Sequence, residues 1–189
     1  MSDTCSDIES VERAAQTAGW RRIGIDGVHG SGKSHLAEML SEVLECPHLE
    51  VEDYLHKNQG GYVDFIDYAA LASALSSLAT FVLSGVCLRE VLVNAGADVD
   101  GNIYIKRSLD GIWVDEDQCV FPDGIDAAIE SLARDRAMVS QYFDEPPEHA
   151  APQGGDDEAP FAEEIMRYHD SYIPQDDADL VFERDINNG

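Results

Sequence analysis

The sequence predicts one domain with an α/β fold, built on a five-stranded, mostly parallel sheet flanked by helices. Three observations support this prediction. Short apolar segments alternate with segments of helical periodicity along the chain. A glycine-rich stretch joins the first apolar segment to a helix. The 189 residues, 44% of them hydrophobic, are enough to bury a core of one domain.

The elements follow in order along residues 1–189. The periodicity predicts an N-terminal helix within residues 1–19 and further helices at 34–45, 67–77, 86–95, 125–142 and 162–172. Strands are expected at 22–26, 48–52, 80–83, 102–106 and 178–182. Residues 111–121 alternate weakly, which indicates a strand extension or a hairpin. Residues 144–160 are rich in proline, glycine and acid, which predicts a mobile loop.

The charge balance excludes several classes of partner. There are 38 Asp and Glu residues against 12 Lys and Arg, which gives a formal net charge of −26. A surface of this sign repels the phosphates of nucleic acids and anionic lipid, so neither is expected as a partner. The acid is spread along the chain rather than confined to one tail. This distribution favours a cytoplasm of high salt over a local acidic segment.

Cysteine usage and the first residues indicate the cytoplasm. The four cysteines are far apart and form no Cys-x-x-Cys pair, so reduced thiols are expected rather than disulfides or a zinc site. The acidic first twenty residues lack a signal-peptide pattern. No apolar run reaches the ~18–20 residues that a membrane-spanning helix needs.

One motif carries chemistry. The stretch GVHGSGKS matches G-x-x-x-x-G-K-[ST] at every defined position, between an expected strand and an expected helix. Its glycines allow backbone N–H groups to surround a phosphate, and the helix adds its positive N-terminal end. Lys33 would contact the β- and γ-phosphates, and the Ser34 hydroxyl would bind Mg²⁺. The residues expected to bind the nucleotide are Gly27, Val28, His29, Gly30, Ser31, Gly32, Lys33, Ser34 and His35.

Several segments together resemble the uridine-kinase-like family of P-loop kinases. The resemblance rests on IGIDGVHGSGKS, VEDYL followed by YVDF, FVLSGV, and RDRAMVSQY with the later RYHDSYIPQDDADLVF, and it spans roughly residues 21–183. It implies a P-loop NTPase fold, ATP and Mg²⁺ as cofactors, and a nucleoside or similar small molecule as the phosphoryl acceptor. In such kinases the second strand ends in an acidic pair whose first acid deprotonates the acceptor hydroxyl or holds the metal. Arginines of a lid close over the phosphates.

The resemblance places particular residues in these roles. Glu52 and Asp53 occupy the acidic pair, with Glu52 slightly favoured as the base and as a second metal ligand. Arg134 and Arg136, with Arg167 as a further candidate, fall in the lid region. The third strand runs into Ser84, where the family usually has Glu. That departure keeps a second hypothesis open, a regulatory nucleotide-binding protein with little or no kinase activity, beside a third, an NTPase that acts on a protein partner.

The net charge predicts that the folded protein becomes more stable with salt. Carboxylates that repel one another in the folded state are screened as the Debye length falls from ~10 Å at ~0.1 M to ~3 Å at ~1 M salt. We therefore expect the melting temperature to rise between about 0.1 and 2 M KCl, measured by differential scanning calorimetry. A flat or falling melting temperature would contradict the proposed adaptation to salt.

Overall fold

The computed structural model describes residues 3–56, 61–142 and 158–187, without the side chains of 139–142, 158 and 159. Its sheet has seven strands and confirms the predicted α/β class. Six follow the order β1-β7-β5-β2-β4-β3, all in parallel, and β6 pairs antiparallel with β5. Their bounds are β1 Asp3–Cys5, β2 Arg22–Asp26, β3 His48–Glu50, β4 Phe81–Ser84, β5 Gly101–Leu109, β6 Ile112–Trp113 and β7 Leu180–Asp185.

The predicted number of five strands is wrong, because β1 was not expected and the strand extension or hairpin indicated at residues 111–121 was not counted. β1 has three residues, none of them fully buried, and it lies in a stretch dominated by the following helix. β6 has two residues and forms the hairpin that residues 111–121 suggested. Neither is long enough to show an alternating pattern. The predicted second strand also stops early, at Glu50, where a 3₁₀ turn begins.

The helices agree closely with expectation except for one short addition. They are α1 Ile8–Ala18, α2 Lys33–Val43, α3 Tyr68–Ser76, α4 Leu88–Ala95, α5 Ile125–Tyr142, α6 Glu158–Tyr172 and the unexpected α7 Pro174–Asp177. Three 3₁₀ turns are η1 Val51–Tyr54, η2 Val63–Phe65 and η3 Glu116–Gln118. Most of the loop predicted at 144–160 falls outside the described residues. No described helix is both long and apolar enough to span a membrane.

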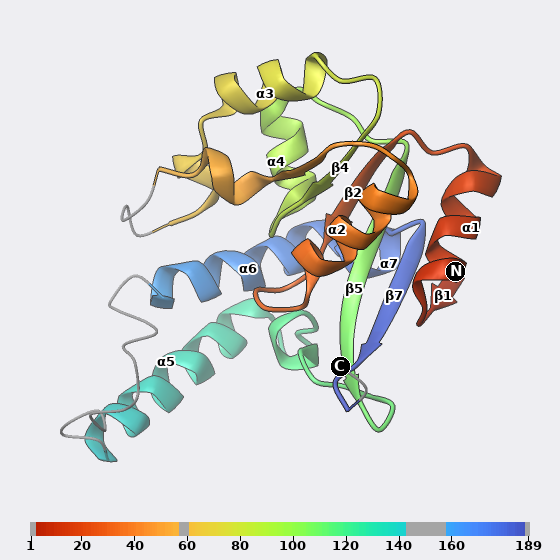
Figure 1. Ribbon diagram of the computed structural model, residues 1–189. Coiled ribbons are helices and arrows are strands. Elements are labelled where there is room, and N and C mark those ends of the chain that lie inside the picture. Colours follow the sequence, from red (N-terminus) through yellow and green to blue (C-terminus); the bar gives the residue numbers. More distant parts are fainter. Residues whose placement is uncertain (1–2, 57–60, 143–157, 188–189) are drawn as a thin grey trace.

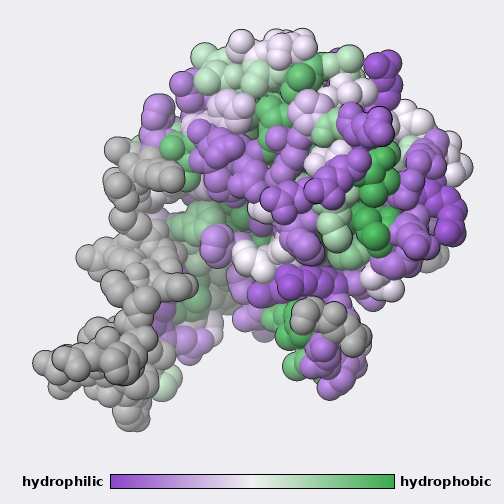
Figure 2. Space-filling view, in the orientation of Figure 1, coloured by the Kyte–Doolittle hydropathy of each residue, from purple (hydrophilic) through white to green (hydrophobic). Residues whose placement is uncertain are grey.

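Helices cover both faces of the sheet (Figure 1). Along β4, Val82 joins the core formed with α1 and α2, whereas its neighbours Phe81 and Leu83 join the core formed with α3, α4 and α6. This alternation is what a strand buried on both faces requires. α5 contacts α6 and extends away from the layers (Figure 1). The visible outer face is mostly hydrophilic (Figure 2), in keeping with the net charge of −26.

Hydrogen bonds connect the buried side of α6 to the sheet. The Tyr168 hydroxyl donates to the Asp26 carboxylate at the end of β2 and accepts from the backbone N–H of Arg89, 3.2 Å away. The next residue, His169, bonds through Nδ1 to the carbonyl of Ile165 at 2.7 Å and through Nε2 to the Tyr104 hydroxyl of β5 at 2.8 Å. Because a carbonyl only accepts, Nδ1 carries the proton and Nε2 accepts from Tyr104.

Burial of His169 makes stability depend on pH. Desolvation lowers the pKa of its imidazole below the usual ~6.5. The unfolded chain therefore binds the proton first as pH falls, and the folded state loses stability from about pH 6.5 downward. Replacing His169 with Gln should cost ~1 kcal/mol near pH 7.5, as expected for a disrupted hydrogen bond.

The matched measurement is the free energy of urea unfolding of both proteins between about pH 7.5 and 5. The difference between wild type and His169→Gln should shrink as pH falls, because only the wild type must keep this buried imidazole neutral. Comparing the two proteins cancels the changing repulsion among the many carboxylates. A difference that stays constant with pH would contradict the assignment.

Candidate active site

The phosphate loop leaves the carboxyl end of β2, between the neighbouring strands β4 and β5. This is the point at which open α/β sheets place ligands, because chains depart to opposite sides there. Three of the loop's glycines adopt positive φ angles, 150° at Gly27, 72° at Gly30 and 100° at Gly32. A Cβ on Gly27 would lie 2.9 Å from the Ser31 hydroxyl and 3.0 Å from the Ile105 carbonyl. The tight loop therefore requires glycine at this position.

The lysine of the motif is turned inward. Lys33 is 7% exposed, and its ammonium donates to the carbonyl of Val28, 2.8 Å away. Burial lowers the pKa of this ammonium, while the carboxylates of Glu52 and Asp26 oppose that shift. At the start of α2, Gly32 provides no side-chain cap. The loop thus presents a cation and a helix N-terminus at the same place, which suits a phosphate.

Two arginines that the sequence analysis missed approach the same loop. Arg107 of β5 and Arg184 of β7 are paired in register on adjacent strands. The Arg184 guanidinium donates to the Ser31 carbonyl at 3.4 Å, and a Cβ on Gly32 would lie 2.7 Å from it. Arg107 is held by a bidentate pair with the buried carboxylate of Asp115. Both arginines lie just beyond the predicted strand ends, at positions that only the strand register brings together.

The two acids of the predicted pair face different surroundings. Glu52 is half-buried, and its charge acts on both Lys33 and the Tyr62 phenol. Asp53 is exposed. Both stand on the 3₁₀ turn η1 rather than on the end of a strand, so the expectation of strand geometry at this pair is corrected. The separation of the two side chains arises from the turn, and their catalytic roles remain predictions.

The other predicted residues lie at varied distances from this centre. Ser34, His35 and His29 are exposed, and the His29 ring meets Phe161 of α6 edge-on at 5.8 Å. Ser84 is buried at the end of β4, where its hydroxyl is 2.9 Å from Nε2 of His48. Val28 is buried in the core.

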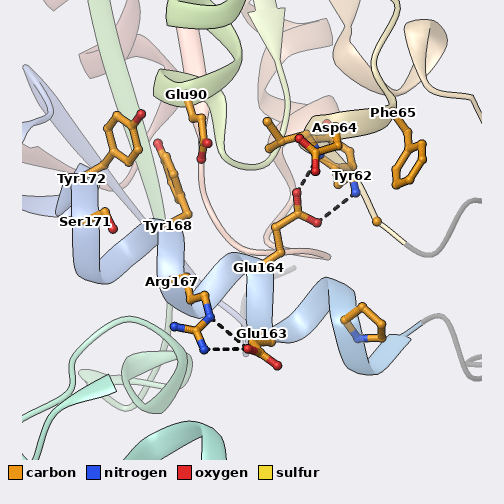
Figure 3. Close-up of a pocket in the computed structure, with 13 residues that line it drawn as sticks. Tyr62, Asp64, Phe65, Glu90, Glu163, Glu164, Arg167, Tyr168, Ser171 and Tyr172 are labelled. Atoms are coloured by element: carbon orange, nitrogen blue, oxygen red, sulfur yellow. Dashed lines mark hydrogen bonds and ion pairs between the residues drawn. The ribbon is translucent and has the colours of Figure 1, made fainter. Parts of the chain in front are cut away.

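The predicted lid arginines stand on α5 and α6. Arg134 is exposed and donates to the Glu130 carbonyl of its own helix. Arg136 lies on the same helix. Neither arginine lines the pocket between η2, α4 and α6 that Figure 3 shows. Arg167 does line that pocket, where it pairs with Glu163 (Figure 3). A role for Arg134 and Arg136 at the phosphates remains a prediction.

A pocket of about 840 Å³ opens beside the phosphate loop, between η2, α4 and α6 (Figure 3). Glu164 lines the pocket. Its carboxylate accepts hydrogen bonds from the backbone N–H groups of Tyr62 at 2.9 Å and Val63 at 2.7 Å. Burial raises the pKa of the Glu90 carboxyl, and the charges of Glu164 and Asp64 raise it further. The pocket is therefore acidic and large enough for a small molecule.

Tyr62 lies between the pocket and the loop. Its side chain is 3% exposed, and the ring contacts Phe161, which in turn contacts His29 of the loop. Burial raises the pKa of the phenol, and the Glu52 carboxylate adds to the rise. The hydroxyl nevertheless has no partner of ordinary hydrogen-bond geometry among the described residues, and the buried Ser31 hydroxyl is in the same position. Unpartnered buried polar atoms are uncommon in native proteins.

The residues present fit a magnesium ion. Mg²⁺ usually takes one or two protein ligands and completes its shell with water and substrate phosphates. Ser34 is exposed at the start of α2, and the half-buried Glu52 acts on the lysine of the same motif. The described residues contain no cluster of three or more His, Cys, Asp or Glu that would hold a metal by itself.

Kinases are among the solved structures to which this chain is similar, at low identity. A possible uridine kinase from Bacillus stearothermophilus is 17% identical with a TM-score of 0.46, covering 93% of this chain and 96% of that chain. The shikimate kinase of Bacteroides thetaiotaomicron is 13% identical with a TM-score of 0.42, covering 87% and 86%. That of Aquifex aeolicus is 19% identical with a TM-score of 0.40, covering 86% of each chain.

No known family profile matches the sequence, and no curated protein gives a significant sequence match. The function is therefore inferred from the chain's own residues.

Two tyrosine variants test whether the Tyr62 hydroxyl is unpartnered. The Tyr62 hydroxyl lies near the Glu52 carboxylate and the Val86 backbone without ordinary hydrogen-bond geometry, so Tyr62→Phe should leave the free energy of unfolding unchanged or raise it. Tyr68→Phe is the matched control, because that hydroxyl donates to the Val63 carbonyl at 2.8 Å and accepts from Asn94 at 3.2 Å. The control should lose ~1 kcal/mol in urea unfolding. An equal loss in both variants would show that Tyr62 is hydrogen-bonded within the protein.

Proposed function

We propose that this protein is an ATP- and Mg²⁺-dependent kinase that transfers the γ-phosphoryl group to a hydroxyl of a small molecule, of the nucleoside type or similar. One observation carries the proposal. A complete phosphate loop carries Lys33, the Glu52 carboxylate acts on both Lys33 and the Tyr62 phenol, and Tyr62 lines an open pocket large enough for an acceptor. A cation for phosphate, a carboxylate for a hydroxyl proton and a pocket for the acceptor are the parts that phosphoryl transfer needs.

The chain's residues would act in a simple order. The phosphates would take the loop's N–H groups and draw Lys33 away from the Val28 carbonyl that it now contacts. Arg184 and Arg107 lie against the glycines of the loop and would add positive charge there. Ser34 and Glu52 would hold Mg²⁺, which would supply positive charge to neutralise the phosphates.

Transfer would then follow from position. The acceptor hydroxyl would lie between Glu52 and the γ-phosphorus. Glu52 would take the hydroxyl proton as the oxygen bonds to phosphorus and the bond to the β-phosphate oxygen breaks, releasing ADP. The protein contributes mainly placement and charge stabilisation.

A second function, nucleotide binding with little or no transfer, is favoured by one observation. Ser84 stands where the resembling family usually has an acid, and its hydroxyl is engaged with His48. A kinase releases ADP faster when an acceptor is supplied, whereas a binding protein does not. Assays with nucleosides, sugars and vitamin precursors, at low and at molar salt, separate the two functions.

Three variants test the proposed roles. Lys33→Ala should abolish turnover while the circular dichroism spectrum is unchanged, because it removes the main cation of the loop. Glu52→Gln should lose ~10²-fold or more in turnover, as expected for an acid–base group, with ATP affinity nearly unchanged.

Asp53→Asn is the matched control, because the same change is made one residue away on an exposed side chain. It should keep most of the turnover. Turnover and ATP affinity are measured separately, by ADP release and by isothermal titration calorimetry. If Glu52→Gln and Asp53→Asn both behave like wild type, the acid pair takes no part in catalysis and the kinase proposal loses its base.

A further inference from the structure

Arg107 has one nitrogen that its ion pair leaves unused. The guanidinium donates to the Asp115 carboxylate from Nε, at 3.0 Å, and from Nη2. Its third nitrogen, Nη1, donates to none of the described residues. The Arg107 side chain is 29% exposed, and Nη1 is not among the buried polar atoms of the described residues that lack a partner. Both N–H groups of Nη1 are therefore accessible to a ligand.

This nitrogen lies beside the phosphate loop. A Cβ placed on Gly30 would lie 3.9 Å from Nη1 of Arg107. The charge of Arg107 also contributes to lowering the pKa of the Lys33 ammonium, so the two cations are close enough to repel each other. Arg184, which pairs with Arg107 in the register of β5 and β7, reaches Gly32 of the same loop.

Three cations thus converge on one short loop of a strongly acidic chain. The protein has only 12 Lys and Arg residues against 38 Asp and Glu, so three cations at one place are a large share of its positive charge. Like charges at this range repel, and an anion between them relieves the repulsion. Among the described residues, the one carboxylate in an ion pair with any of the three is that of Asp115. The arrangement suits an anion with several charges, such as a phosphate chain.

A tight hairpin brings Asp115 to Arg107. β5 and β6 are joined by Asp110 and Gly111, whose φ angles of 51° and 80° are the positive values that the favoured two-residue hairpin turn requires. Asp115 follows β6 by two residues, and its side chain is 1% exposed. A buried carboxylate needs its partner, so the pair is held firmly. The two parallel hydrogen bonds also fix the plane of the guanidinium, and with it the position of Nη1.

The sheet places Arg107 and the pocket of Figure 3 on opposite sides of the loop. β4 and β5 flank β2 on its two sides (Figure 1). The chain that leaves β4 forms α4, whose Glu90 lines that pocket, whereas Arg107 stands on β5. In the proposed function the γ-phosphate faces the pocket, so the rest of the phosphate chain extends toward β5. Arg107 is therefore next to the part of the nucleotide that ADP retains.

We propose that Arg107 binds the α- and β-phosphates of the nucleotide through Nη1, and that Asp115 is a positioning residue that orients it. The proposal rests on the proposed function only for the nucleotide in the phosphate loop, and not for transfer to an acceptor. It gives the β5–β6 hairpin a role in nucleotide binding, apart from the predicted lid arginines of α5.

Binding of ADP and of inorganic pyrophosphate, each with Mg²⁺ present, tests the role of Arg107. Affinities are measured by isothermal titration calorimetry, without an acceptor and without turnover. Arg107→Gln removes the charge and Nη1, so the affinity for both ligands should fall about tenfold or more, as expected for a lost hydrogen bond to a charged group. A similar loss for both ligands identifies the phosphates, which are the part that they share.

Asp115→Asn tests the positioning role by the sign of its effect. Removing a negative charge near bound phosphate would by itself strengthen binding. Loss of the bidentate pair should instead weaken ADP binding, because Nη1 is no longer held in place. In the Arg107→Gln background the same change should cause no further weakening, since there is no arginine left to orient. A merely structural role would lower the free energy of urea unfolding in Asp115→Asn and leave ADP affinity unaffected.

The chain offers a matched control in a second arginine–aspartate pair. Arg89 and Asp177 are joined at 2.8 Å and line a different pocket, away from the phosphate loop. Arg89→Gln and Asp177→Asn make the same chemical changes there, and both should bind ADP like wild type. Lys33→Ala should lose ADP binding, which confirms that the ligand occupies the loop.

Several outcomes would overturn the proposal. ADP affinity that is unchanged in Arg107→Gln, or unchanged or higher in Asp115→Asn, would do so even where Lys33→Ala abolishes binding, and the proposed function would then still stand. An unchanged affinity for pyrophosphate beside a weakened affinity for ADP would place Arg107 at the nucleoside instead. If wild type binds no ADP, or Lys33→Ala binds it equally well, the phosphate loop is not the nucleotide site and the proposed function fails as well.

Discussion

The contact between Asp26 and Tyr168 holds the site together. Asp26 ends β2 and is 5% exposed, and desolvation raises the pKa of its carboxyl. It accepts from the Gly27 N–H at 2.7 Å, which sets the first turn of the phosphate loop, and from the Tyr168 hydroxyl of α6. One buried carboxylate therefore contacts both the phosphate loop and the helix that lines the pocket of Figure 3. A buried acid that loses a hydrogen-bond partner is costly, so loss of the Tyr168 contact would destabilise the protein.

Charge is distributed in an uneven way that suits a nucleotide. The chain carries −26 overall, yet Lys33, Arg107 and Arg184 all approach the same short loop. At long range the acidic surface repels a nucleotide, and this repulsion is weakened by salt. At short range the loop offers cations and free N–H groups. The pocket beside it is acidic, so the two parts of the site differ in the charge that they attract.

The features that could be predicted from the sequence are those that depend on residues close together in the chain. The phosphate loop is a contiguous motif whose geometry depends on its own glycines, and the strand and helix around it were placed correctly. Glu52 and Asp53 were found as a pair, but the 3₁₀ turn that separates their side chains has no clear sequence signal.

The residues that escaped prediction depend on contacts between distant segments. Arg107 and Arg184 lie 77 residues apart in the sequence and meet through the register of β5 and β7. Asp26 accepts a hydrogen bond from Tyr168, which lies 142 positions later. A single sequence contains no record of such pairings. β1 was not predicted for another reason, because three residues are too few to show an alternating apolar pattern.

That first strand has a bearing on how copies of the molecule behave toward one another. β1 lies beside β7 in the register Asp3–Leu180, Thr4–Val181 and Cys5–Phe182, and so occupies backbone groups that β7 would otherwise leave open. An open, apolar strand edge is a template for adding strands from other chains, which is a common start of aggregation. A three-residue strand that begins with aspartate offers a poor template. The sheet is thereby closed to edge-to-edge growth on this side, a protection supplied by the least conspicuous element of the fold.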